Sequence, residues 1–294
     1  MSKVLVTGGQ GFIGGHVIRK LIERGYQVIS LDRHFSKPFV GVEYRANDIC
    51  DAEAVDQAVF AVDGVIHLAG ILGTAETLQH ISETVKANIC GTINVFEAIR
   101  KYQKRCVYIT LPDVWMNPYA ITKRTAKDFA FVYNNAFGTK INVVRGFNVY
   151  GEGQKYKPVQ KFAPNWIIGA IQGKPLKVYG DGSQLMDLVY VGDTAEILIR
   201  ALESDKTMMN SDEVIDAAPG QGVPVIEVAN LFAKMLDAKI DFQPMRAGET
   251  NKAIIQANVE TQKRFFGEEC KFTSLEDGMT KTIEWYKEHY QELL

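Results

Sequence analysis

The stretch Thr7-Gly8-Gly9-Gln10-Gly11-Phe12-Ile13-Gly14 decides the fold of this chain. It follows the apolar run Val4-Leu5-Val6 and leads into a helical apolar pattern over residues 17–22. A strand, a glycine-rich turn and a helix in this order are the context that a dinucleotide-binding fingerprint requires. Glycines permit a tight turn and a close approach of the backbone to a pyrophosphate, and the helix N-terminus offers free N–H groups to the phosphates.

A carboxylate stands at the end of the next predicted strand. This strand covers residues 27–31 and leads to Asp32, eighteen residues after Gly14. A carboxylate at this place accepts hydrogen bonds from the adenosine ribose and repels a 2′-phosphate, so the sequence favours NAD over NADP. Arg33, the next residue, weakens that preference.

The composition is that of a globular protein with nearly balanced charges. The 294 residues are 46% hydrophobic and 23% charged, with a formal net charge of -2. Neither nucleic acid nor a membrane is therefore expected as a partner, and no apolar run reaches the roughly 18 residues of a transmembrane helix. Met1-Ser2-Lys3 leads directly into a predicted strand, so we expect no signal peptide and a cytoplasmic protein. The cysteines at positions 50, 90, 106 and 270 are far apart, which indicates reduced thiols and no metal site.

The first half of the chain alternates strands and helices. Further strands are predicted at residues 42–46, 64–68, 106–110 and 141–145. Helices are predicted from the cap Asp51, over residues 81–101, and from Asn117-Pro118 to Gly138. This alternation predicts an α/β fold, a doubly wound parallel (Rossmann) sheet that binds its ligand at the carboxyl ends of the strands.

The pattern changes near Tyr150, after which prolines, glycines and lysines become frequent. Residues 1–150 are predicted to form the NAD-binding domain. Residues 151–294 are predicted to form mostly a smaller mixed lobe that covers the carboxyl edge of the sheet. The segments near 187–202 and 214–235 are expected to return to the first domain.

Two residues suited to alcohol oxidation stand near the start of the helix that Asn117 caps. Tyr119 and Lys123 are four residues apart, which places them on one face, one turn from each other. A free tyrosine has a pKa of about 10, and a lysine ammonium beside it favours the phenolate and lowers that pKa. Such a tyrosine can take a proton from a sugar hydroxyl while nicotinamide takes the hydride from the carbon.

With these residues the chain resembles the extended short-chain dehydrogenase/reductase family, the nucleotide-sugar epimerases and dehydratases, over nearly its whole length. The resemblance implies NAD as the cofactor and a nucleotide sugar as the substrate. The cofactor site that it implies consists of Gly8, Gly11, Phe12, Ile13, Gly14, Asp32, Arg33, Asp48, Ile49, Leu68, Ala69, Gly70 and Lys123. Tyr119 and Lys123 resemble the catalytic pair, and Asn88 resembles a helix asparagine that supports a water and lysine network.

The resemblance also implies residues that bind the substrate. Asn148 lies in a segment similar to the family's Arg-x-x-Asn-x-Tyr-Gly, whose asparagine contacts the substrate. Residues 178–184, which include Tyr179, and residues 187–191 match the family's nucleotide-binding hairpin. Arg246-Ala247-Gly248-Glu249 resembles the loop whose arginine holds the diphosphate. The helices over 81–101 and 117–138 resemble the family's dimer face, which implies a homodimer.

Departures from the family pattern bear on the activity. Leu111 stands where the family usually has a serine or threonine, and Thr110 lies one residue earlier. Either Thr110 takes the catalytic role through a shifted backbone, or the hydroxyl is missing. Val114 is only five residues before Tyr119, where the family has a long loop, so the sugar pocket is expected to be more open or closed by other residues.

Two further departures concern charge and proton transfer. Met186 stands where the hairpin often has an arginine for the diphosphate. Arg246 remains, and the lysines that could compensate are Lys155, Lys157 and Lys161. Pro112 and Asp113 replace the Asp-Glu pair of the dehydratases, and because proline has no proton to give, a 4,6-dehydratase is disfavoured.

The sequence therefore predicts an NAD-dependent nucleotide-sugar epimerase that inverts C4 of a UDP-sugar through a transient 4-keto intermediate. A reductase or decarboxylase of the same family is the alternative enzyme. A non-catalytic sensor that binds NAD or a nucleotide sugar is the alternative from another class. Leu111, Met186 and the short loop favour the sensor, whereas the retained Tyr119 and Lys123 argue against it.

Overall fold

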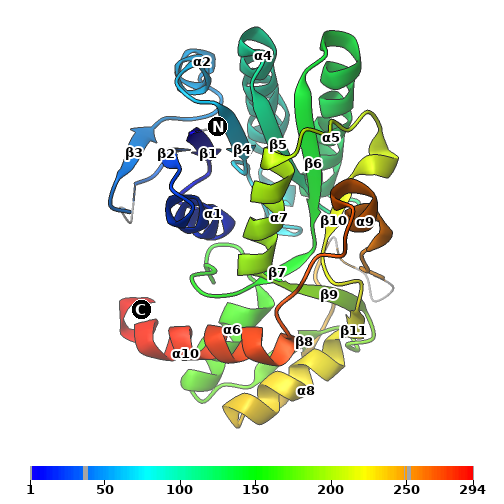
Figure 1. Cartoon of the computed structure of the whole chain (residues 1–294). Helices are drawn as coiled ribbons and strands as arrows, with labels where there is room; N and C mark the ends of the chain where they lie inside the picture. Colours follow the sequence, from blue (N-terminus) through cyan, green and yellow to red (C-terminus); the bar gives the residue numbers. More distant parts are fainter. Residues whose placement is uncertain (1, 36–38, 248, 250–252, 294) are drawn as a thin grey trace.

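A computed structural model describes residues 2–35, 39–247, 249 and 253–293. Its larger lobe is built on a seven-stranded parallel sheet with the strand order β10-β6-β5-β4-β1-β2-β3 (Figure 1). The strands are β1 (Lys3–Thr7), β2 (Gln27–Asp32), β3 (Val42–Ala46), β4 (Gly64–His67), β5 (Arg105–Thr110), β6 (Lys140–Gly146) and β10 (Ile215–Ala217). The central strands are continuous apolar runs because both faces of a parallel sheet are covered by helices. This confirms the predicted doubly wound fold.

Helices cover both faces of this sheet (Figure 1). One face carries α1 (Phe12–Glu23) and α7 (Val191–Glu203), which pack against each other. The other face carries α2 (Ala52–Phe60), α4 (Thr92–Tyr102) and α5 (Pro118–Phe137).

The predicted caps of α2 and α5 are confirmed. The Asp51 side chain accepts hydrogen bonds from the second and third backbone N–H groups of α2. The Asn117 side chain accepts from the N–H of Ala120 at 2.9 Å, and Gly138 ends α5 with a left-handed φ of 63°. These caps satisfy N–H and C=O groups that have no partner inside a helix.

The helix expected over residues 81–101 is interrupted by a π-helical turn. It consists of α3 (Ile81–Val85), the π-helical segment η2 (Lys86–Gly91) and α4. Gly91 lies so close to Ile49 that a Cβ on it would come within 2.8 Å of the Ile49 Cδ1. Asn88 is buried in the π-helical turn. Such turns are frequent at functional sites because the extra residue redirects a side chain.

The smaller lobe contains two short sheets and its own core. One sheet pairs β8 (Leu176–Tyr179) with β12 (Ile240–Gln243), and the other has the order β11-β9-β7, with β11 (Gly222–Pro224), β9 (Leu185–Tyr190) and β7 (Asn148–Tyr150). The helices are α6 (Phe162–Ile171), α8 (Val225–Leu236) and α10 (Leu275–Leu293). Large side chains such as Tyr150, Trp166, Phe232 and Tyr286 fill the core between them.

The structure changes two expectations about the second half. The segments 178–184 and 187–191 were expected to form one hairpin, but β8 and β9 do not pair with each other, because β12 and the strands β7 and β11 supply their partners. The segment 214–235 divides: β10 joins the large sheet, whereas α8 packs in the core of the smaller lobe. A further helix, α9 (Glu260–Phe266), packs against β10 of the large sheet.

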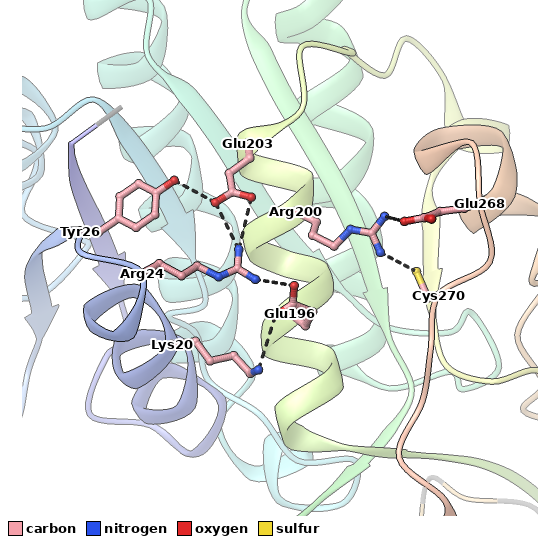
Figure 2. Close-up of polar contacts among 8 residues, drawn as sticks. All are labelled: Lys20, Arg24, Tyr26, Glu196, Arg200, Glu203, Glu268 and Cys270. Carbon is pink, nitrogen blue, oxygen red and sulfur yellow. Dashed lines mark hydrogen bonds and ion pairs between the residues drawn. The ribbon is translucent and has the colours of Figure 1, made fainter.

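Ion pairs join α1 to α7 on the outside of the larger lobe (Figure 2). Arg24 pairs with both Glu196 and Glu203 of α7, the latter at 3.2 Å, and the Tyr26 hydroxyl donates to Glu203 at 2.8 Å. Lys20 adds a 3.4 Å pair with Glu196. Glu196 thus connects two helices that are far apart in the sequence.

Candidate active site

A cavity of about 540 Å³ opens at the carboxyl edge of the large sheet. Its walls come from both lobes, and they include all thirteen residues that the sequence analysis assigns to the cofactor. They also include Tyr119, Thr110 and Asn148. The ends of parallel strands are where a doubly wound fold binds its ligand.

The glycine turn leaves no room for side chains. Gly8 has a left-handed φ of +71°, and a Cβ on it would lie 2.8 Å from the backbone nitrogen of Ala69. A Cβ on Gly14 would overlap the carbonyl oxygen of Gly8. No side chain caps the start of α1, where Gly11 is the N-cap. The free N–H groups at this helix start can therefore face a phosphate, which is the cradle that a dinucleotide needs.

The far end of the cavity carries two carboxylates and one cation. Asp32 is oriented by two backbone N–H groups, those of Gln10 at 3.1 Å and His34 at 3.3 Å. Arg33 lies 3.9 Å from the carboxylate of Asp48. Asp32 stands at the end of β2, where a ribose carboxylate is found in dinucleotide-binding folds. These residues fit an adenosine with a free 2′-hydroxyl.

Tyr119 and Lys123 lie in the first turns of α5 and both line the cavity. Burial lowers the pKa of Lys123 to about 7 and raises the pKa of Tyr119 to about 12. The direction for Tyr119 is opposite to the sequence-based expectation, because the low dielectric of the buried site disfavours the phenolate. The Lys123 amino group faces the Tyr108 ring, 4.1 Å from its centre.

Asn88 connects the Gly70–Ile71 segment of the cavity wall to helix α5. Its amide oxygen accepts from the N–H of Ile71 at 2.7 Å, and its amide nitrogen donates to the Ile71 carbonyl at 2.8 Å. The same nitrogen donates to the hydroxyl of Thr122 at 3.0 Å. Asn88 therefore positions the Gly70–Ile71 segment and contacts the residue next to Lys123, rather than Lys123 itself.

The end of β5 presents one hydroxyl and an apolar loop. Thr110 lines the cavity, and its hydroxyl donates to the Lys123 carbonyl at a long 3.4 Å. Leu111, Pro112 and Trp115 line the same cavity. Sequence reasoning missed Trp115 as a wall residue, although its place four residues before Tyr119 could have indicated it.

The three substrate residues expected from the sequence do not lie together. Asn148 lines the cavity, and its buried amide oxygen has no hydrogen-bond partner among the described residues. Arg246 and Tyr179 are not among the wall residues; the Arg246 guanidinium lies 5.4 Å from the Tyr179 ring centre and pairs with Glu249. Gly248 of the same expected loop lies outside the described residues. Met186 is buried in the core of the smaller lobe.

A lysine from the smaller lobe provides positive charge in this cavity. Lys161 lines it and is the N-cap residue of α6, whose start no side chain caps. Its amino group forms no hydrogen bond or ion pair with any residue in the described part of the chain, and burial lowers its pKa. Lys155 lines the cavity as well. The sequence analysis proposed Lys155, Lys157 and Lys161 as compensating charges. The structure places Lys155 and Lys161 in the cavity wall, but not Lys157.

A metal cluster and a membrane-spanning helix are both absent from the described residues. No group of three His, Cys, Asp or Glu side chains there could hold a metal ion. No helix in that part of the chain is both long and apolar enough to cross a membrane. His67, fully buried between Thr7 and Thr92, is packed at the end of β4.

A glycine cradle, a ribose carboxylate and a Tyr/Lys pair around one cavity define the class of extended short-chain dehydrogenases/reductases. A family model described as the NAD dependent epimerase/dehydratase family matches residues 4–215, and the chain belongs to this family. The glycine cradle and the carboxylate fit NAD, the cofactor of this family.

Similar proteins cover nearly the whole chain. The UDP-N-acetyl-alpha-D-glucosaminuronate decarboxylase of Bacillus cytotoxicus is 28% identical over 98% of this chain and 98% of its own length. The UDP-glucuronate 4-epimerase of Thermodesulfobacterium geofontis is 26% identical over 99% of this chain and 98% of its own. The crystal structure of UDP-glucose 4-epimerase from Thermotoga maritima with UDP-glucose superimposes with a TM-score of 0.88, 26% identity, and coverage of 98% and 99% of the two chains.

Proposed function

We propose that this protein is an NAD-dependent epimerase that inverts C4 of a UDP-sugar through a transient 4-keto sugar. One observation carries the proposal: the buried Tyr119/Lys123 pair shares a single cavity with the glycine cradle and with cationic side chains from the smaller lobe. The described wall residues of that cavity include only two carboxylates, Asp32 and Asp48. Both belong to the cofactor end, so the remaining wall suits an anionic diphosphate.

The residues of the chain have separate roles in this reaction. Tyr119 takes the proton of the sugar 4-hydroxyl at its phenolic oxygen and later returns it. When bound, NAD supplies the reversible oxidation of the carbon. Lys123, when protonated, supplies positive charge that favours the phenolate. Asn148 offers its unpaired amide oxygen to a sugar hydroxyl.

We assign the diphosphate to Lys161 and the start of α6, rather than to Arg246. The amino group of Lys161 forms no hydrogen bond or ion pair with a described residue, although Glu76 and Glu249 lie near enough to act on its charge, whereas Arg246 is paired directly with Glu249. The uncapped N–H groups of α6 add to the attraction, because a helix N-terminus favours an anion. Inversion further requires that the sugar turn within the cavity while the diphosphate stays bound.

The decisive experiment incubates NAD-loaded protein with UDP-glucose, UDP-N-acetylglucosamine and UDP-glucuronate and identifies the products by anion exchange and NMR. An epimerase yields the 4-epimer with unchanged mass and no net change in NAD. Release of CO2 from UDP-glucuronate would assign a decarboxylase, which the Bacillus cytotoxicus relative favours. No product with any substrate, despite binding, would assign a sensor.

Two tyrosine variants test the proposed base. Tyr119→Phe removes the phenol and should lower kcat at least 100-fold while NAD remains bound. Tyr102→Phe is the matched control, because this hydroxyl bonds Asp56 on the outside of α4. Equal activity of both variants would exclude Tyr119 as the base.

We also propose a homodimer. The faces of α3 and α5 expose large apolar side chains, among them Ile81 (54% exposed), Val132 (52%) and Phe137 (47%). Exposed apolar side chains gathered on neighbouring helices indicate a protein interface. Light scattering should give twice the chain mass, and Val132→Glu should give the mass of one chain.

A further inference from the structure

The loop between β5 and α5 forms an apolar wall of the cavity. Leu111, Pro112 and Trp115 line it. The loop is held at Asp113, whose carboxylate pairs with Arg124 of α5 at 2.7 Å, and at Asn117, which caps α5. These contacts connect the wall to α5, the helix that carries Tyr119.

The indole of Trp115 has no polar, aromatic or cationic partner among the described residues. Its N–H has no hydrogen-bond acceptor and its ring no aromatic or cationic neighbour among the residues that the structure describes. The other tryptophans differ. Trp166 is buried and donates to the Lys177 carbonyl at 2.8 Å, and Trp285 stacks on His289 with ring centres 4.4 Å apart. Trp115 is thus a large amphipathic side chain whose ring and N–H can both face a ligand.

The chemistry of this wall selects a particular kind of substituent. Leu111 and Pro112 offer apolar surface and no side-chain hydrogen-bond donor. The Trp115 indole offers apolar surface and one N–H donor. An acetamido group matches both, because its methyl group is apolar and its carbonyl oxygen accepts a hydrogen bond. A hydroxyl or a carboxylate on the sugar could accept from the same N–H, but neither offers apolar surface to Leu111 and Pro112.

We propose that Leu111, Pro112 and Trp115 form a subsite for an acetamido group, and that the substrate is an N-acetylated UDP-sugar. This inference rests on the proposed function, since it assumes that a nucleotide sugar enters the cavity. It goes beyond that function by naming the sugar substituent and the residue that recognises it. Trp115 is a specificity-determining residue in this proposal, and Tyr119 remains the base.

The test measures the affinity of NAD-loaded protein for UDP, UDP-glucose, UDP-N-acetylglucosamine, UDP-6-deoxyglucose and UDP-glucuronate by calorimetry. UDP-N-acetylglucosamine should bind at least roughly 10-fold more tightly than UDP-glucose, as expected for a small apolar group in a matching pocket. Trp115→Ala should abolish this preference and leave the affinity for UDP unchanged. Trp115→Phe, which keeps a ring but loses the N–H, should retain part of the preference.

Two controls test whether Trp115→Ala remains folded and whether the effect is specific to Trp115. The melting temperature and the NAD content of Trp115→Ala should equal those of the parent protein. Trp285→Phe, a change at a tryptophan that is not among the wall residues, should alter no affinity.

Three outcomes would overturn the inference, and a fourth would refute the function on which it rests. Equal binding of UDP-glucose and UDP-N-acetylglucosamine, or a preference that survives Trp115→Ala, would exclude the acetamido subsite and leave the proposed function intact. If UDP-6-deoxyglucose bound as tightly as UDP-N-acetylglucosamine, the wall would bind any apolar substituent and would not be specific for an acetamido group. Failure to bind UDP or any UDP-sugar would instead refute the proposed function itself.

Discussion

The amino group of Lys123, a buried residue of the cavity wall, lies 4.1 Å from the centre of the Tyr108 ring. It forms no hydrogen bond or ion pair with another described residue, so the ring is its main electrostatic partner there. Burial removes water from the ammonium group, and an aromatic face replaces only part of the stabilisation that this water gives the charge. This loss of water lowers the pKa of Lys123 to about 7.

The lowered pKa of Lys123 makes stability depend on pH. In the unfolded chain its pKa is about 10.4, so between pH 7 and 10 the unfolded state binds more protons than the folded one. The free energy of unfolding of the NAD-free protein should therefore rise with pH, by up to about 1.4 kcal/mol per pH unit from this group, and lose this rise below pH 7. Urea unfolding at pH 7, 8 and 9 measures the slope. Lys123→Met should lack this part of it, and equal slopes would contradict the lowered pKa.

Asn88 should matter for stability as well as for NAD binding. Asn88→Ala removes three hydrogen bonds, one buried and two partly buried, and leaves the N–H and C=O of Ile71 unpaired, which should cost about 2–4 kcal/mol of unfolding free energy. The NAD affinity should fall too, because Gly70 and Ile71 line the cavity. Asn94→Ala, which loses one bond to the Ile49 carbonyl, is the control and should cost about 1 kcal/mol. If both variants lost the same unfolding free energy, Asn88 would contribute no more to stability than a residue with one hydrogen bond.

Asp32 should set the choice between NAD and NADP. Asp32→Ser removes the carboxylate that we expect to face the ribose, so the ratio of NAD to NADP affinity should fall at least roughly 10-fold. Arg33→Ala should have the converse effect and weaken only NADP, because it removes the nearby cation. Fluorescence titration of both cofactors measures the ratios. An unchanged ratio in Asp32→Ser would remove Asp32 from the ribose site.

The hydroxyl of Thr110 should serve the reaction in place of the one missing at Leu111. Its bond to the Lys123 carbonyl is long, 3.4 Å, and therefore weak, so the hydroxyl can turn toward a substrate oxygen. Thr110→Val should lower kcat roughly 10-fold with little change in KM, whereas Thr110→Ser should retain most of the rate. If Thr110→Val kept full activity, the reaction would proceed without a hydroxyl at this place.

The ion pairs around Arg24 should stabilise the packing of α1 on α7 (Figure 2). Single surface pairs contribute little, but Arg24 bridges two carboxylates, and Arg24→Ala should cost about 1 kcal/mol of unfolding free energy. The loss should shrink in 1 M salt because salt screens exposed charges. Lys3→Ala breaks one pair, that with Glu43, and should cost less. A loss that is independent of salt would indicate packing rather than charge.

Several parts of this protein follow from short stretches of sequence. The turn at Gly8, the caps Asp51 and Asn117, and the spacing of Tyr119 and Lys123 were all predicted, and the structure contains each of them. They are predictable because their physical causes are local. Backbone freedom, a side chain that bonds an N–H two or three residues away, and the helical repeat all act within a few residues.

Tertiary structure alone decided the parts that depend on distant contacts. The partners of strands β8 and β9 and the contact of the π-helical turn at Asn88 with the Gly70–Ile71 segment involve residues that come together only in the fold. The same holds for the raised pKa of Tyr119, because burial outweighs the neighbouring lysine. The sequence by itself thus determined the class of fold and the chemical groups. The surroundings of those groups were decided by packing, since burial and electrostatics depend on neighbours from the whole chain.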